Sequence, residues 1–326
     1  MSLAPASVDA LLARAHALEE RIGRRILGQS GVIRELLITL IAGGHALVRG
    51  VPGLAKTLLV RALAEATRLS FKRVQFTPDL LPSDITGSEV LDSGQEAQGR
   101  REFRFLRGPV FVNLLLADEI NRTAPKTQAA LLEAMGERQV TVGGASHPLP
   151  APFCVVATQN PIEQEGTYPL PEAQLDRFLL CIKVDYPAED DEVRVLQATT
   201  GTLAPPLEPV LDAADVLALQ ALVRDVAAAE SLVRGVAALV RSSRPGTEKG
   251  SGRIAWGAGP RGGQALLLAA KARALLEGRF AAGADDVRAL ALPVLRHRLV
   301  LSWAAVGEGA EADAIVRELV ARSPFG

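Results

Sequence analysis

The stretch that decides the fold is His45-Ala46-Leu47-Val48-Arg49-Gly50-Val51-Pro52-Gly53-Leu54-Ala55-Lys56-Thr57, near the start of a 326-residue chain. Its first four residues are mostly apolar and predict a short buried strand. The segment 58–67 that follows is rich in Leu and Ala and predicts a helix. A glycine-bearing turn between a buried strand and a helix is the setting that a phosphate-binding loop requires.

The predicted loop binds phosphate through its backbone and two side chains. Backbone N–H groups and the positive end of the helix cradle the phosphates, and Gly53 lets the main chain approach closely. Lys56 is expected to reach the β- and γ-phosphates, and the Thr57 hydroxyl to ligate magnesium. Ala55 replaces the last glycine of the motif, and we expect helical dihedral angles there, which suit alanine. The alternative is a tight turn with an incidental lysine. The expected nucleotide-binding residues of this loop are Gly50, Val51, Pro52, Gly53, Leu54, Ala55, Lys56, Thr57 and Leu58.

A second motif, 114–119, is an apolar run that ends in Asp118 and Glu119. Ligands of α/β sheets bind at the carboxyl ends of strands, where these two acids would stand. Asp118 fits the Walker B role of holding magnesium, and Glu119 fits the base that orients an attacking water. Two carboxylates at a strand end can also be a solvated edge or a helix cap. The Lys56-Thr57 pair about 60 residues earlier makes the catalytic interpretation the stronger one.

A third apolar run, 155–157, leads into Thr158-Gln159-Asn160-Pro161. The Asn160 amide is placed to hydrogen-bond a γ-phosphate or an attacking water. The alternative is an ordinary turn, because Asn-Pro is a common turn opener. The motif alone does not decide between the two.

Strand and helix patterns alternate up to about residue 185, which predicts an α/β core with a mostly parallel sheet. An excursion at about 78–107 and a hairpin at about 139–150 interrupt it. We predict an ATPase-like core over 1–186 and a small all-helical domain over 187–326, because strand signals disappear past Pro187. The predicted helices of the second domain are 213–226, 230–241, 262–276, 285–299 and 310–321.

Composition excludes several classes of protein. The chain has 36 basic and 37 acidic side chains and only 4% aromatics, which argues against nucleic-acid partners. The longest apolar stretch, 36–48, contains Thr39, two glycines and His45, so no membrane span is expected. Without a secretory signal pattern at its start, the chain is expected in the cytoplasm. Cys154 and Cys181 lie in apolar runs and are expected to be small core residues.

The two long runs 108–122 and 157–178 resemble the MoxR family of AAA+ ATPases. The resemblance is dense from Gly28 to Val184, and it resumes at 257–261 and 284–299. Between about 201 and 251 little resemblance remains beyond a helical pattern. The resemblance to the MoxR family implies a P-loop AAA+ core followed by a helical lid, with ATP and Mg²⁺ as cofactors.

The resemblance also implies roles for single residues. Asn160 matches sensor 1, and Arg177 matches the arginine finger presented to the ATP of the next subunit, where it stabilises transition-state charge. The alternative for Arg177 is an ion pair with Asp176 or another acid. Arg261 matches sensor 2 on the lid, although Gly259 stands where the family usually has serine.

Three further positions match the family. Gly28 and Gln29 match the loop beside the adenine, and Gln75 matches a polar switch that restrains Glu119. The excursion at 78–107 resembles a helix-2 insert, and the hairpin after it resembles the pre-sensor 1 hairpin. Both elements are expected to face the pore or upper surface of a ring, where substrates are engaged.

The resemblance implies a homo-oligomeric ring, specifically a hexamer, and chaperone-like remodelling or maturation of a protein complex whose identity the sequence does not reveal. A von Willebrand factor A domain protein is the partner that it suggests. The alternatives are a metal-chelatase-type motor subunit, a DNA motor and a non-hydrolysing nucleotide-dependent scaffold. The unbroken run 164–174 favours MoxR over the chelatase, and the presence of Lys56, Thr57, Asp118, Glu119 and Arg177 disfavours the scaffold.

Overall fold

The computed structural model describes residues 5–92, 102–161, 166–201, 206–246 and 252–325. Its centre is a five-stranded sheet in the order β2-β5-β8-β1-β9, and all four pairings are parallel. The predicted α/β core with a mostly parallel sheet is therefore confirmed. The strands are β1 (Ala46–Arg49), β2 (Phe71–Gln75), β5 (Leu114–Asp118), β8 (Cys154–Gln159) and β9 (Leu180–Lys183).

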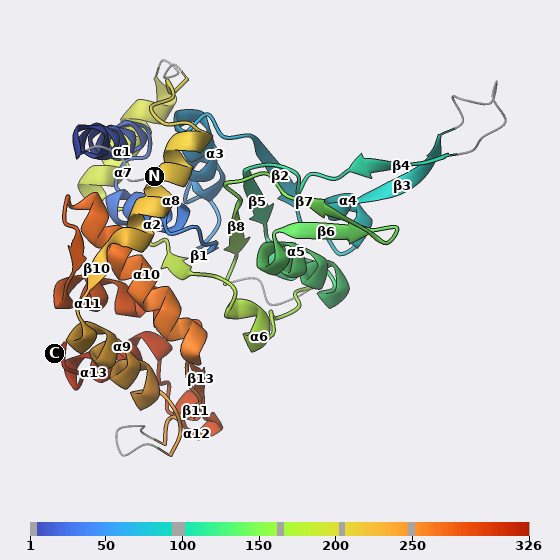
Figure 1. Ribbon diagram of the computed structural model, residues 1–326. Coiled ribbons are helices and arrows are strands. Elements are labelled where there is room, and N and C mark those ends of the chain that lie inside the picture. Colours follow the sequence, from blue (N-terminus) through green and yellow to red (C-terminus); the bar gives the residue numbers. More distant parts are fainter. Residues whose placement is uncertain (1–4, 93–101, 162–165, 202–205, 247–251, 326) are drawn as a thin grey trace.

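Helices cover both faces of the sheet (Figure 1). Successive side chains of β5 alternate between two hydrophobic cores: Leu114 and Leu116 lie in one, Leu115 and Ala117 in the other. The first core is lined by α1, α2 and α3, and the second by α4 and α5. The bounds of these helices are α1 (Pro5–Arg25), α2 (Ser30–Ile41), α3 (Lys56–Ala66), α4 (Pro82–Thr86) and α5 (Pro125–Glu137).

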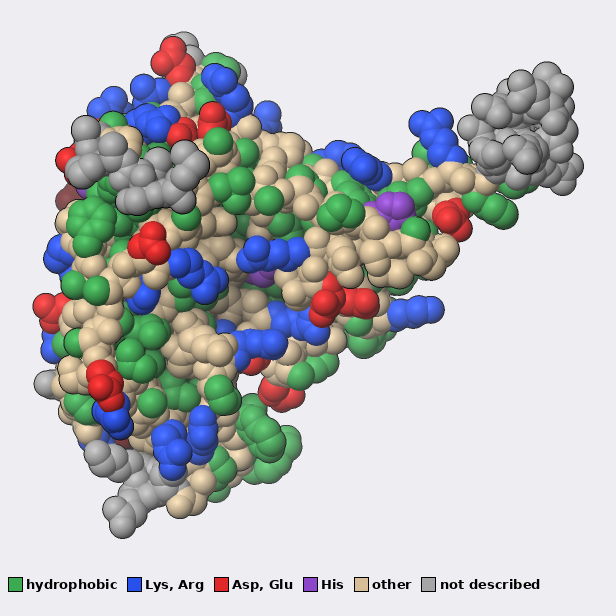
Figure 2. Space-filling view, in the orientation of Figure 1, with side chains coloured by type: hydrophobic (Ala, Val, Ile, Leu, Met, Phe, Trp, Pro, Cys, Tyr) green, Lys and Arg blue, Asp and Glu red, His purple; other side chains and the backbone are tan. Residues whose placement is uncertain are grey.

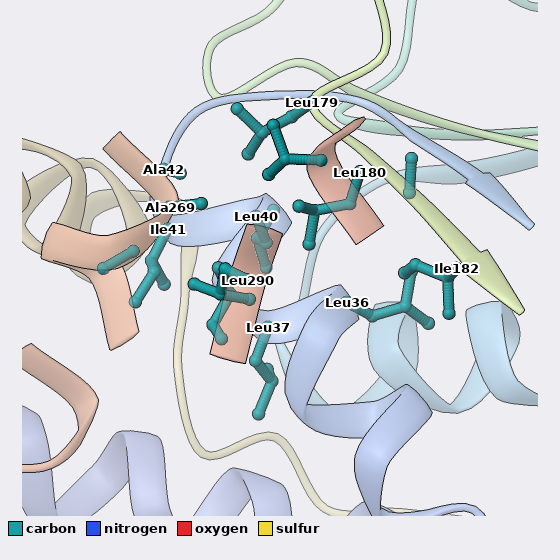
Figure 3. Close-up of a cluster of buried hydrophobic side chains, with 14 of the residues drawn as sticks. Leu36, Leu37, Leu40, Ile41, Ala42, Leu179, Leu180, Ile182, Ala269 and Leu290 are labelled. Atoms are coloured by element: carbon teal, nitrogen blue, oxygen red, sulfur yellow. The ribbon is translucent and has the colours of Figure 1, made fainter. Parts of the chain in front are cut away.

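The first core runs without interruption from the sheet into the C-terminal helices. Figure 3 shows Leu36 of α2 beside Ile182 of β9, and Leu290 of α11 (Ala284–Leu295) within the same cluster. This packing holds the second domain against the N-terminal helices. It thereby positions the C-terminal residues next to the start of β9.

Two antiparallel hairpins leave the core where the excursion and the hairpin were expected. The first, β3 (Gly87–Asp92) with β4 (Glu102–Arg107), extends far from the body of the protein (Figure 1). The part of the predicted insert at 93–101 lies outside the described residues. The second hairpin is β6 (Gln139–Val142) with β7 (Ala145–Pro148). The Phe105 and His147 rings stack at a centroid distance of 4.1 Å and join the two hairpins.

The C-terminal part is mostly helical, but it is not wholly helical as predicted. It also contains a parallel pair of strands, β10 (Ala227–Ala228) with β12 (Ala281–Ala282), and an antiparallel pair, β11 (Ile254–Trp256) with β13 (Val300–Leu301). Strands of two or three residues are too short for an alternating pattern to reveal. The helices are α7 (Glu189–Thr200), α8 (Ala213–Asp225), α9 (Glu230–Ser242), α10 (Pro260–Leu276), α11 (Ala284–Leu295), α12 (Trp303–Gly307) and α13 (Ala312–Ala321).

Strand β5 begins at Leu114, although the turn and bend residues just before it, 110–113, include the buried Val110 and Val112. An apolar run shows burial and cannot show where a strand begins. Helix α7 escaped prediction because none of its residues is buried, so no apolar stripe marks it.

Both cysteines are free and buried, as expected of core residues, and burial raises the pKa of the Cys154 thiol to about 12. Across the described residues, every helix is too short or too polar to cross a membrane.

Candidate functional site

The predicted phosphate loop follows the carboxyl end of β1 and leads into α3. Two of its positions, Gly50 and Gly53, require glycine for structural reasons. A Cβ on Gly50 would stand 2.7 Å from the carbonyl oxygen of Val184, and Gly53 has a φ of +86°, which side chains disfavour. The loop therefore stays close to β9 and turns sharply before the helix.

Ala55 adopts a left-handed conformation, with φ 54° and ψ 22°, as the residue that precedes α3. The prediction of right-handed helical angles at this position was wrong. Because alanine carries a Cβ, the left-handed conformation costs about 1–2 kcal/mol that glycine would avoid. The loop still has its turn, but it holds a strained residue where the motif normally has glycine.

Helix α3 directs its first backbone N–H groups and its positive dipole end toward the loop. The Lys56 ammonium donates a hydrogen bond to the carbonyl oxygen of Gly50, and so it lies folded over the loop. The Thr57 hydroxyl lies 3.4 Å from Oδ2 of Asp118. The two motifs, 61 positions apart in the chain, therefore meet at the carboxyl edge of the sheet.

Asp118 is 7% exposed and receives hydrogen bonds at both carboxylate oxygens. The buried Thr158 hydroxyl donates to Oδ1 at 2.6 Å, and Arg73 donates to Oδ2 from Nε at 2.9 Å. The guanidinium Nη2 of Arg73 lies 2.7 Å from the same Oδ2. The carboxylate is thus held in one orientation, with a cation already beside it.

This pair of oxygens fits a magnesium ion. Mg²⁺ prefers oxygen ligands and is commonly held by one carboxylate and one hydroxyl together with substrate phosphates. Asp118 Oδ2 and Thr57 Oγ1 supply those two groups next to the phosphate loop. The guanidinium at Oδ2 shows that a positive charge is accommodated at that oxygen.

Glu119 follows β5 with a left-handed backbone, φ 57° and ψ 49°. Its N–H donates to the Thr158 hydroxyl at 2.8 Å. Its Oε2 accepts hydrogen bonds from the Gln75 amide at 2.7 Å and from Arg122 at 3.2 Å. Gln75 and Glu119, paired in the prediction as switch and base, are therefore in direct contact.

Asn160 comes directly after β8, the strand that lies between β5 and β1 in the sheet, and it is 4% exposed. Its neighbour Gln159 accepts a 2.9 Å hydrogen bond from Arg49, and the Gln159 carbonyl accepts one from Gly50 N–H at 3.4 Å. This ladder places the end of β8 directly beside the phosphate loop.

Gly28 and Gln29 lie beside the same loop, next to a mainly apolar cavity of about 120 Å³. Gln29 lines this cavity and donates a 3.1 Å hydrogen bond to the carbonyl of Asp185. A Cβ on Gly28 would come within 2.8 Å of Asp191 of α7. The other walls include Gly53, Leu54, Ala55, Leu58, Pro187, Val195 and Ala198. This arrangement suits a flat apolar ring such as a purine.

Arg177 and Arg261 do not join this cluster. They line a second cavity of about 560 Å³, whose wall includes His45 at the start of β1. Arg177 lies just before β9, which runs parallel to β1, so it stands at the amino edge of the sheet. The Arg177 guanidinium donates to the carbonyl of Leu132, and Arg261 lies 3.8 Å from Asp176. The structure thus separates the predicted site residues into two groups at opposite edges of the sheet.

Two residues of the first group, Arg73 and Thr158, were not predicted from the sequence. Thr158 lies in the quoted run 155–161, and its buried position two residues before Asn160 was the available signal. Arg73 has no motif around it. Only its pairing register, two residues before Gln75 on the strand beside β5, brings it to Asp118.

Two family models match the chain. The model of the ATPase family associated with various cellular activities (AAA) matches residues 45–180, and an AAA lid domain model matches residues 251–319.

Whole-length relatives extend these matches. The chain is 41% identical over 323 residues to "Chaperone MoxR1" of Mycobacterium tuberculosis, covering 97% of this chain and 84% of that one. It is 45% identical over 302 residues to the uncharacterized protein YeaC of Bacillus subtilis, covering 92% and 91%. A crystal structure of a candidate ATPase from Cytophaga hutchinsonii is similar with a TM-score of 0.88 and 38% identity, covering 97% and 96%.

Proposed function

The chain belongs to the MoxR family of AAA+ ATPases, and on this premise we propose that it hydrolyses ATP at the interface between neighbouring copies in a ring. Each turnover drives chaperone-like remodelling or maturation of a protein complex. The observation that carries the proposal is the division of the site into two groups. The phosphate loop and the acids lie at the carboxyl edge of the sheet, and the two arginines lie at the amino edge.

This division favours hydrolysis between subunits. Strands rise about 3.3 Å per residue, so the four-residue strand β1 separates the two edges by roughly 13 Å. Arg177 and Arg261 cannot contact a nucleotide on their own phosphate loop across that distance. A neighbouring copy in a head-to-tail ring brings its own loop to them, as heterologous interfaces do when they close. Both arginines then serve the neighbour's nucleotide.

The residues at the carboxyl edge have distinct tasks in this reaction. Lys56 leaves the Gly50 carbonyl to bind the β- and γ-phosphates, and the N-terminus of α3 supplies backbone donors. Glu119 orients the attacking water, and Asn160 hydrogen-bonds that water or the γ-phosphate. Thr57 and Asp118 would hold Mg²⁺, which would neutralise negative charge on the phosphates. Arg177 stabilises the charge that develops on the transferred phosphoryl group.

Both hairpins are the proposed contact with the client. The β3–β4 hairpin projects from the body (Figure 2). It carries Phe103 and Leu91, which are 70% and 46% exposed. Its exposed Arg104 and Arg107 add positive charge to the same arm. Phe105 stacks on His147 of the second hairpin, so a movement of one hairpin is transmitted to the other.

The ring is proposed to be a homohexamer in the cytoplasm that works with a von Willebrand factor A domain protein. Support for these finer points is the family membership alone, since the family assembles as rings. The core of 1–186 and the lid of 187–326 remain the proposed mechanical units. Closing the lid over the neighbour's nucleotide would link hydrolysis to movement between copies.

Steady-state ATP hydrolysis against protein concentration tests the proposal, with Lys56→Ala and Glu119→Gln as controls. The expected result is a turnover per subunit that rises with concentration and disappears in both controls. A constant turnover per subunit, down to dilutions at which the chain is monomeric, contradicts the interface. A parent chain with no turnover at any concentration contradicts hydrolysis.

A further inference from the structure

Arg73 connects the magnesium ligand to the catalytic glutamate through side chains alone. Strand β2 pairs with β5 so that Gln75 stands opposite Asp118, and Arg73 points from the same face two residues earlier. The Arg73 Nη2 group lies 2.7 Å from Asp118 Oδ2 and donates a 2.6 Å hydrogen bond to Gln75 Oε1. One guanidinium nitrogen therefore contacts both residues.

This contact also fixes the direction of the Gln75 amide. A guanidinium only donates hydrogen bonds, so the Gln75 oxygen must face Arg73. The amide nitrogen then faces the other way, and it donates to Glu119 Oε2 at 2.7 Å. If Arg73 moved away, the amide would lose the partner that sets its orientation. The restraint on Glu119 thus depends on where Arg73 lies.

The position of Arg73 conflicts with a bound metal. Its guanidinium occupies Oδ2 of Asp118, the same oxygen that the Thr57 hydroxyl approaches at 3.4 Å. Two cations at one carboxylate oxygen repel each other strongly at short distance. The arginine has room to leave, because its side chain is 49% exposed.

We propose that Arg73 is a positioning residue that competes with magnesium for Asp118 and, while it is bound there, holds Gln75 in the orientation that restrains Glu119. The inference rests on the proposed function and deepens it. Without a metal, Arg73 neutralises the charge of Asp118, and the Gln75 amide restrains Glu119. Loading the site with metal and nucleotide displaces Arg73, which frees the Gln75 amide and, with it, Glu119.

The test is a Mg²⁺ titration of fluorescent ADP binding to the full chain. Arg73→Met keeps the length of the side chain and removes its charge, so its half-saturating Mg²⁺ concentration should fall by about tenfold. Arg73→Lys restores a cation beside Asp118 and should return the midpoint toward that of the parent. Arg234→Met removes an exposed arginine that pairs with Glu230 on α9, outside the site, and should keep the parental midpoint. ADP binding in excess chelator should be equal in Arg73→Met and the parent.

The Arg73 side chain is 49% exposed, but that of Asp118 is only 10% exposed, so Arg73→Met takes a cation away from a buried carboxylate and the folding of each variant has to be measured. A matching thermal unfolding midpoint for each variant checks this directly. An unchanged or raised Mg²⁺ midpoint in Arg73→Met, with a parent that binds ADP, overturns the inference alone. A parent that binds no nucleotide in the presence of Mg²⁺ overturns the proposed function and this inference together.

Discussion

Arg298 of the lid donates a 2.8 Å hydrogen bond to the carboxylate of Asp176, the residue that immediately precedes Arg177. The Arg298 side chain is 2% exposed, and it also donates to the carbonyl oxygens of Asp176 and Phe178 at 3.2 and 2.6 Å. Burial lowers the pKa of Arg298, and the negative charge of Asp176 opposes that shift. The lid is therefore fastened to the segment that carries the proposed arginine finger.

Replacing Arg298 by methionine should destabilise the protein strongly. The change leaves the carboxylate and several carbonyl oxygens without their donor, and breaking such a pair costs about 3 kcal/mol. Urea unfolding measures the loss. Arg234→Met is the matched control, because Arg234 pairs with Glu230 on an exposed helix face and should change stability little. Equal effects of the two substitutions would contradict the role assigned to Arg298.

Ala55→Gly should stabilise the chain by about 1 kcal/mol, because glycine adopts the φ of 54° without the steric cost that alanine has. Ala238→Gly is the control, and there the same substitution should lower the stability. Ala238 lies exposed inside α9, where glycine should cost about 1 kcal/mol. Both values follow from thermal or urea unfolding. A loss of stability in Ala55→Gly would mean that the left-handed conformation is not strained.

Thr158→Val should lower stability by about 2 kcal/mol and weaken nucleotide binding that depends on Mg²⁺. The Thr158 hydroxyl donates to Asp118 and accepts from the N–H of Glu119, so valine leaves two buried groups unpaired. Thr158→Ser keeps the hydroxyl and should stay close to the parent. Urea unfolding and a fluorescent ADP titration give the two readouts. Valine and serine variants with the same behaviour would show that the hydroxyl is dispensable.

Stability should rise with pH between about 5 and 6.5. Burial lowers the pKa of His45 from its usual 6.5 to about 4, and burial together with Arg298 lowers that of His297 well below its usual value. Burial also raises the pKa of Glu35 from 4.5 to about 7, against the opposing charge of Arg296. The two histidines of the unfolded chain bind nearly two protons near pH 5 and about one at pH 6.5, whereas the native chain binds about one, on Glu35. The difference is therefore about one proton near pH 5 and becomes small toward pH 6.5, and it favours the unfolded state as pH falls.

The slope of unfolding free energy against pH measures this proton difference. Glu35→Gln removes the opposing group, so the same slope should steepen toward about two protons. A slope that is flat in the parent, or unaltered in the glutamine variant, would contradict the assignment of these buried groups.

The position of the proposed phosphate loop, the two acids and Asn160 at one edge of the sheet could be predicted because each lies directly after an apolar run. Local sequence determines both the buried strand and the residue at its end, and parallel strands then bring those ends together. The sequence alone could not reveal contacts between strands far apart in the chain. Arg73 and Asp118 are 45 positions apart, and only the register of β2 on β5 joins them.

Other features escaped prediction for different physical reasons. Helix α7 has no buried residue, so periodicity had nothing to detect, yet its Val195 lines the apolar cavity beside Gln29. The conformation of Ala55 followed from the sharp turn of the loop, which overrode the preference of alanine for right-handed angles. The separation of Arg177 from the loop required the strand order, which places β9 beside β1.

Mixing two inactive variants tests the central claim, hydrolysis between copies, most directly. Arg177→Ala retains the phosphate loop and Glu119 but loses the finger, which should reduce turnover by about a thousandfold. Glu119→Gln retains Arg177 but cannot orient the attacking water. Excess Glu119→Gln subunits should raise the rate per Arg177→Ala subunit well above the sum of the separate rates, because each supplies the missing arginine to a neighbour. A mixture no faster than that sum, in conditions where the parent is active and the variants co-assemble, would contradict the account.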